Sequence, residues 1–345
     1  MKKTLQILFG LTLLAALAEG LVLIRIRIDP WRLAALMESV ALLVGAFVGL
    51  TQTAFIKQLR HWATTSAALA GGLPFLLLIP YLISALGTGT FSLLAFGKLI
   101  AYILVPTALL LPGRLHQEET FGWRDAVALL ALAVPVAAGW LGGIWIWPQD
   151  IYIFRPIFCV LVGGYAFMVL RNLEGVGFRL VWRRGDIWDA LLNLIAFCLI
   201  AIPLGLGLNF IHPHPMAPLG HGLVFQLHGI ENIEGGLGPL VNFLFLFIGI
   251  YLTVAIPEEL LFRGILQNLL VRTIRRGPRG LYGLLTASVL FGLAHLHHAP
   301  VPNWRYATMA TLAGIFYGNV YRTRQRLCAS ALTHALVDTI WHFWF

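Results

Sequence analysis

The stretch Ile250–Arg272, IYLTVAIPEELLFRGILQNLLVR, places two adjacent carboxylates and an arginine inside an otherwise apolar run. A run of this length can cross the roughly 30 Å of hydrocarbon in a bilayer as a helix. An ionisable group at the centre of such a helix costs at least ~2.5–3.5 kcal/mol. We therefore expect Glu258, Glu259 and Arg263 to have partners inside the protein and to serve a function.

The spacing of these three residues predicts different roles for the two carboxylates. Glu259 and Arg263 are four residues apart, so on a helix they share a face and can pair. Glu258 points about 100° away, which leaves it outside that pair. This arrangement favours a structural role for Glu259 and a reactive role for Glu258. Pro257 either kinks one long helix or begins a new helix at its first position.

The rest of the chain has the composition of a helical membrane protein. Of its 345 residues, 59% are hydrophobic and 11% are charged, whereas about a quarter of a soluble domain is charged. This excludes a soluble globular enzyme, a disordered chain and a coiled coil. The net charge of +9 does not indicate nucleic-acid binding, because the basic residues lie in short clusters between apolar runs. We expect an all-α polytopic transmembrane bundle.

A window of about 20 residues gives about eleven candidate spans. They lie near 5–24, 33–56, 66–86, 91–112, 125–147, 151–170, 187–210, 239–271, 281–298, 306–321 and 327–345. We interpret 5–24 as a retained first span, because the apolar run is long for a signal peptide and no cleavage site follows it. We interpret 177–189 either as an interfacial segment or as an ordinary loop.

Two later spans each carry a polar residue set at helical spacing. FGLAHLHHAP ends the ninth span and places Phe291 and His295 four residues apart. THALVDTIWHF, in the eleventh span, places His334 and Asp338 on one face, which His342 would extend by a further turn. Each of these groups would cost several kcal/mol without partners, so their occurrence in the last third of the chain predicts one shared polar site.

In this order, EELLFRG (Glu258–Gly264), FGLAH (Phe291–His295) and HALVD (His334–Asp338) resemble the three motifs of the CPBP family. This is the CAAX-protease and bacteriocin-processing group of intramembrane proteases, also called Abi. Three motifs in order are more specific than any one alone. The resemblance divides the chain into an N-terminal transmembrane region of unassigned role, 1–176, and a CPBP-like intramembrane protease domain, 177–345, with its motifs in 239–345.

The resemblance implies an intramembrane endopeptidase that hydrolyses a peptide bond of a membrane-anchored or membrane-associated protein or peptide. It implies that Glu258 and His295 activate a water, that His334 and Asp338 stabilise the oxyanion, and that Glu259 and Arg263 shape the site. Asp338 stands where the family often has Asn, and an ionised Asp cannot donate to an oxyanion. Asp338 therefore either orients His334 or stays protonated through burial.

Two other functions remain open: a C-terminal tail-sorting protease of the same family, and a proton-coupled membrane transporter whose acids and histidines form a proton relay. A transporter should show inverted repeats and broken helices in both halves, whereas the polar groups lie in the final third. A third alternative is an inert scaffold or immunity protein, against which the intact Glu and His set argues. We expect a multi-pass protein of the bacterial inner membrane, with the lipid bilayer and a peptide substrate as partners.

The sequence favours a reaction without a cofactor or metal ion. Two Glu and two His are ligand types for zinc, but HExxH is missing and water activation by a glutamate needs no metal. A weaker candidate for a metal site is the loop that carries His212, His214, His221 and His228, because a flexible Pro/Gly-rich loop lacks fixed ligand geometry.

Overall fold

The computed structural model describes residues 29–115, 120–147, 153–213, 238–274 and 280–345. All regular secondary structure in these ranges is helical, which confirms the all-α class. The predicted span 5–24 lies outside the described residues, and so does most of the loop 211–238.

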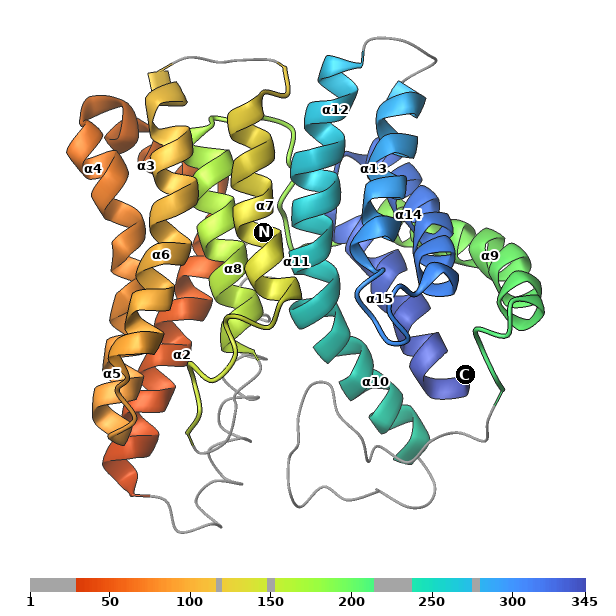
Figure 1. Ribbon diagram of the computed structural model, residues 1–345, viewed down its shortest axis with the longest axis horizontal. Coiled ribbons are helices and arrows are strands. Elements are labelled where there is room, and N and C mark those ends of the chain that lie inside the picture. Colours follow the sequence, from red (N-terminus) through yellow and green to blue (C-terminus); the bar gives the residue numbers. More distant parts are fainter. Residues whose placement is uncertain (1–28, 116–119, 148–152, 214–237, 275–279) are drawn as a thin grey trace.

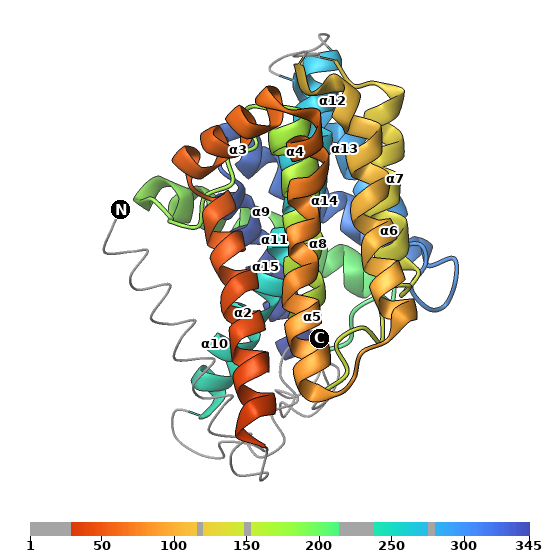
Figure 2. The ribbon, with the colours of Figure 1, turned by 90° about the vertical axis from the view of Figure 1, so that its left-hand side faces the viewer.

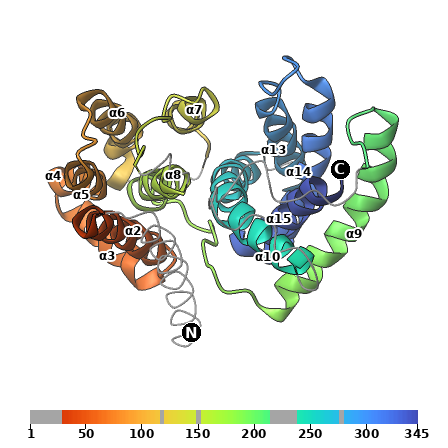
Figure 3. The same ribbon diagram turned by 90° about the horizontal axis from the view of Figure 1, so that it is seen from below.

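The helices form two groups that lie side by side (Figures 1 and 3). The N-terminal group consists of α2 (Pro30–Leu50), α3 (Thr53–Thr65), α4 (Ala67–Gly72), η1 (Leu73–Leu77), α5 (Leu78–Thr88), α6 (Leu93–Leu110), η2 (Leu111–Leu115), α7 (Trp123–Ala137), α8 (Phe154–Gly164) and η3 (Tyr165–Leu170). The C-terminal group consists of α9 (Arg184–Gly207), α10 (Gly238–Ile250), η4 (Tyr251–Ala255), α11 (Ile256–Glu259), η5 (Leu260–Gln267), α12 (Asn268–Thr273), α13 (Leu281–Ala294), α14 (Trp304–Arg324) and α15 (Leu327–Trp344).

The structure confirms apolar spanning helices but not the predicted number of eleven. Within the described ranges, five helices are long and apolar enough to cross a membrane: Pro30–Leu50, Ala67–Thr88, Leu93–Leu115, Arg184–Gly207 and Asn242–Thr273. The apolar helices Phe154–Leu170 and Leu281–Ala294 are shorter. The predicted span 125–147 ends as a helix at Ala137, where Gly139 and Gly143 adopt positive φ angles and turn the chain.

The segment Asn242–Thr273 forms one continuous helix that carries the first motif. It stands at the border between the two groups, and Figure 2 shows α11 behind the N-terminal helices. Pro257 neither ends this helix nor begins a separate one. Two stretches of wider π-helical turn, Tyr251–Ala255 and Leu260–Gln267, flank it and accommodate a residue that has no N–H to donate.

The connection between the two groups, 171–183, contains no helix, and α9 begins at Arg184, so 177–189 is part connection and part helix, and its position at the membrane interface stays a prediction. Side chains of the C-terminal group hold this connection in place. Tyr321 Oη donates to the carbonyl oxygen of Gly175 at 2.6 Å. Gly177 has a φ of +66°, and a Cβ there would lie 2.2 Å from the carbonyl oxygen of Gln325. The close approach therefore requires glycine.

Candidate active site

Glu259 is the centre of a buried polar cluster. Its Oε1 lies 2.9 Å from Arg263 Nη1 and 2.9 Å from His334 Nδ1. Its Oε2 accepts a hydrogen bond from Ser330 Oγ. Glu259 itself is completely buried. The predicted pair with Arg263 is confirmed, and three donors from two helical segments, η5 and α15, occupy this carboxylate. Glu259 thus orders the site and is not available to a substrate.

The guanidinium of Arg263 is held by aromatic rings as well as by Glu259. Its Cζ lies 4.2 Å from the ring centroid of Phe291 and 5.3 Å from that of Tyr317. Its Nη2 donates to the carbonyl oxygen of Gly314 at 3.3 Å. Phe291, the first residue of the second motif, therefore contributes to the site by packing on this arginine.

The imidazole of His334 lies among three carboxylates. Its Nε2 is 3.3 Å from Asp338 Oδ2 and 3.8 Å from Glu258 Oε2, while Nδ1 faces Glu259. Tyr317 stacks on the ring at a centroid distance of 4.5 Å. The predicted common face of His334 and Asp338 is thus observed, and the contact fits the orienting role for Asp338. An ionised carboxylate only accepts hydrogen bonds, so this arrangement suits an imidazole that donates from both nitrogens.

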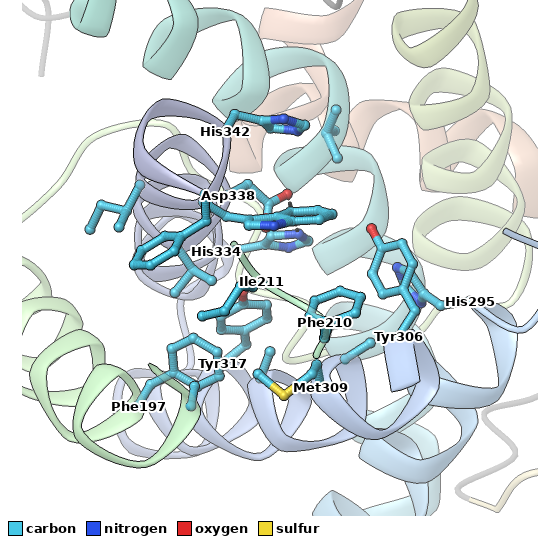
Figure 4. A pocket seen from close by; sticks show the side chains of 18 of the residues that line it. Phe197, Phe210, Ile211, His295, Tyr306, Met309, Tyr317, His334, Asp338 and His342 are labelled. Atoms are coloured by element: carbon cyan, nitrogen blue, oxygen red, sulfur yellow. Dashed lines mark ion pairs between the residues drawn. The ribbon is translucent and has the colours of Figure 1, made fainter. Parts of the chain in front are cut away.

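Four predicted site residues line one cavity of about 400 Å³ within the C-terminal group, and Figure 4 shows three of them. The carboxylates of this site differ in exposure: the side chain of Glu258 is 34% exposed and that of Asp338 23%, against 0% for Glu259. In Figure 4, His295 lies across the cavity from His334 and Asp338. The four cavity-lining residues are Glu258, His295, His334 and Asp338.

Glu258 and His295 line the same cavity, but the structure places no hydrogen bond or ion pair between them. His295 Nδ1 lies 2.8 Å from the carbonyl oxygen of Phe291. A carbonyl oxygen only accepts, so Nδ1 carries the hydrogen, and Nε2 is left for another partner. Tyr306 packs against the same ring at a centroid distance of 4.9 Å. The cooperation of Glu258 with His295 therefore stays a prediction that needs a water between them.

Several residues of the cluster were missed by the sequence analysis. Ser330 lies four residues before His334, so the same helical face was the available signal. Gln267 Nε2 donates to the carbonyl oxygen of Gly318 at 3.0 Å, one turn beyond the contact of Arg263 with Gly314. The spacing of Gly314 and Gly318 is the small-residue pattern that lets membrane helices approach closely.

The weaker candidates lie at the edge of the cavity or outside it. His342 lines the cavity and stacks on Trp341 at 5.0 Å. His212 contacts Asn209, and the other three histidines of its loop lie outside the described residues. Among the residues that the structure describes, no group of three or more His, Cys, Asp or Glu side chains has an arrangement that could hold a metal ion.

Comparison with known families bears on the C-terminal group. Residues 240–340 match the family model described as "Type II CAAX prenyl endopeptidase Rce1-like". The match spans all three motifs, from Glu258 to Asp338. No curated protein and no solved structure matches the chain.

Proposed function

We propose that this integral membrane protein, whose residues 240–340 place it with the CPBP/CAAX proteases, cleaves a membrane-associated peptide with a water activated by Glu258 and His295. One observation carries the choice of Glu258. Its Oε2 has no hydrogen-bond partner among the described residues, whereas the adjacent Glu259 is engaged by three donors. Glu258 also lines the cavity with a side chain that is 34% exposed, so its carboxylate can take a proton from a reacting water.

In the proposed reaction, a water lies between Glu258 and Nε2 of His295. Glu258 accepts a proton as the water oxygen attacks the peptide carbonyl carbon, and it later delivers this proton to the leaving amine. His334 donates from Nε2 to the oxyanion that forms, while Glu259 holds Nδ1. A carboxylate that fixes a histidine in this way plays the part of the aspartate in a Ser-His-Asp triad. Asp338 keeps Nε2 of His334 directed toward the cavity.

The substrate that we propose is a membrane-anchored protein or peptide, cleaved near the bilayer in a bacterial inner membrane. The matched family description names a prenyl endopeptidase for CAAX sequences, so a prenylated CAAX peptide is the first substrate to assay. The cavity is lined largely by apolar and aromatic side chains, among them Phe197, Phe210, Met309 and Trp341, which suits an apolar peptide segment.

The test compares C-terminal peptide fragments in membranes that contain the wild-type protein, Glu258→Gln or Glu38→Gln. Glu38 is an exposed glutamate of α2, so Glu38→Gln is a matched control outside the site. We expect one set of fragments in the wild type and in Glu38→Gln, and its loss in Glu258→Gln at equal protein amounts. Identical fragments in all three membranes would contradict the proposed function.

A further inference from the structure

A second cavity, of about 320 Å³, lies where the N-terminal helices meet the C-terminal group. We name it the junction cavity. One wall comes from α6, α7 and α8 and includes Tyr102, Ala133 and Val160. The opposite wall comes from η4, α11 and η5 and includes Leu261 and Phe262. The volume falls in the range of ligand-binding sites, and much of the lining is apolar.

The junction cavity shares part of its lining with the cavity of about 400 Å³ at the candidate active site, which we name the catalytic cavity. Val254, Glu258, His295 and His298 line both. The residues proposed to activate the water therefore stand in the wall between two cavities. An endopeptidase has to bind chain on both sides of the bond that it cuts, so one cavity on each side of the reacting groups is what its substrate requires.

The placement of His334 assigns a direction to the bound chain. His334 and Asp338 line the catalytic cavity and do not line the junction cavity. The carbonyl oxygen of the scissile bond has to point toward His334, so the acyl side of the substrate lies in the catalytic cavity. The leaving amine has to reach Glu258, which borders both cavities. The chain that follows this amine then continues into the junction cavity.

We propose that the junction cavity binds the apolar residues that follow the scissile bond, so that α6, α7 and α8 form the binding site for the leaving segment. This inference rests on the proposed function and adds to it a preference for apolar residues after the scissile bond. The occupant is a short apolar stretch of polypeptide, because the two cavities share four lining residues and the junction cavity is enclosed largely by apolar side chains. The N-terminal helices thereby act in substrate selection.

The variant that tests this proposal is Ala133→Phe, which fills the junction cavity from α7. Its matched control is Val134→Phe, because Val134 is 54% exposed and does not line either cavity. Each protein, in liposomes, is assayed on two peptides that differ only after the scissile bond, one with two leucines and one with two alanines. We expect Ala133→Phe to lower kcat/KM for the leucine peptide about 10-fold, mainly through KM, with little change for the alanine peptide. Val134→Phe should act as wild type on both.

A binding measurement separates this proposal from the proposed function. A photo-reactive benzoylphenylalanine replaces Val136, which also lines the junction cavity but is 53% exposed, in the Glu258→Gln background, and the cross-linked product is mapped by mass spectrometry. Cross-links to the residues after the scissile bond support the proposal, whereas a wild type that cleaves neither peptide overturns the proposed function and this proposal with it. Cross-links to lipid alone, or an equal loss of activity on both peptides in Ala133→Phe, would overturn the proposal and leave the cleavage reaction standing. Unchanged activity of Ala133→Phe on both peptides would overturn it as well.

Discussion

The N-terminal and C-terminal groups of helices treat buried polar side chains differently. In the N-terminal group, the buried hydroxyls of Ser39 and Ser84 both donate to the carbonyl oxygen of Pro80, at 2.7 and 3.0 Å. The same group also buries Asp125 of α7, which pairs with Arg171 at 2.7 Å, whereas the C-terminal group buries Glu259 together with both Arg263 and a histidine. A hydroxyl is satisfied by any nearby carbonyl, whereas a buried charge requires an opposite charge and further donors. The ion pair of the N-terminal group lines neither cavity, whereas the histidine that Glu259 holds lines the catalytic one, so the C-terminal group is favoured for the proposed chemistry.

The largest expected effect is on stability, in Arg263→Ala. Removing one partner of a buried ion pair leaves Glu259 uncompensated and should cost ~3–5 kcal/mol. The N-terminal comparison is Arg114→Ala, because Arg114 is partly exposed and donates to the carbonyl oxygens of Ala63 and Leu111. We expect a loss of about 0.5–1.5 kcal/mol there. Thermal unfolding in detergent measures both, and equal stabilities would show that the cluster is not the stabilising feature of the C-terminal group.

The next effect is on activity, in Glu258→Gln. The change preserves volume and removes the proposed base, so cleavage should fall ~10²-fold or more while the protein accumulates normally. Glu259→Gln should instead accumulate poorly, because its three donors are matched to a carboxylate. Cleavage rates and membrane levels distinguish the two acids. Near-normal cleavage by Glu258→Gln would remove this residue from the reaction.

A smaller difference should separate two serines. Ser330 donates to the carboxylate of Glu259, and hydrogen bonds to charged groups are worth about 1.5–3 kcal/mol. Ser84 donates to neutral carbonyls within its own helix, where about 0.5–1.5 kcal/mol is usual. We expect Ser330→Ala to unfold at a clearly lower temperature than Ser84→Ala. The reverse order in matched thermal scans would weaken the contrast between the two groups.

Removing metal ions should have the smallest effect. Both ring nitrogens of His334 face carboxylates, and His295 Nδ1 faces a carbonyl oxygen, so the reaction that we propose relies on side chains alone. We expect full activity after treatment with a strong, membrane-accessible chelator and no stoichiometric metal in the purified protein. One zinc per chain, with activity that follows its removal and return, would require Glu258, His295 and His334 to be reinterpreted as ligands around a metal-bound water.

The sequence predicted the parts of the site that depend on helical periodicity. The pair Glu259–Arg263 and the shared face of His334 and Asp338 follow from i, i+4 spacing, and both are observed. Contacts between helices that are far apart in the sequence could not be predicted from this periodicity. Nothing in the spacing indicates that Glu259 joins His334 across 75 residues of chain, because helix packing decides which faces meet.

The predicted fold class was right, but the limits of several spans were not. Hydropathy identifies apolar residues without distinguishing a long helix from a helix followed by turns. The predicted span 125–147 shows this, since its apolar residues continue past Ala137 while positive φ angles at Gly139 and Gly143 end the helix. Pro257 shows the opposite case, because wider turns on either side let the helix continue through it. The division at 176/177 stays a prediction.

The connection 171–183 has a consequence for how the protein can be shortened. Asn268 and Arg272 of α12 both donate to the carbonyl oxygen of Glu174, at 2.7 and 2.8 Å, and Tyr321 of α14 donates to the next residue, Gly175. A recombinant fragment that began at α9 would remove these backbone acceptors and leave three donors at the end of the long helix and of α14 without their partners. A C-terminal fragment that retains 171–183 keeps all of them, so a C-terminal half that is to fold on its own has to begin before this connection.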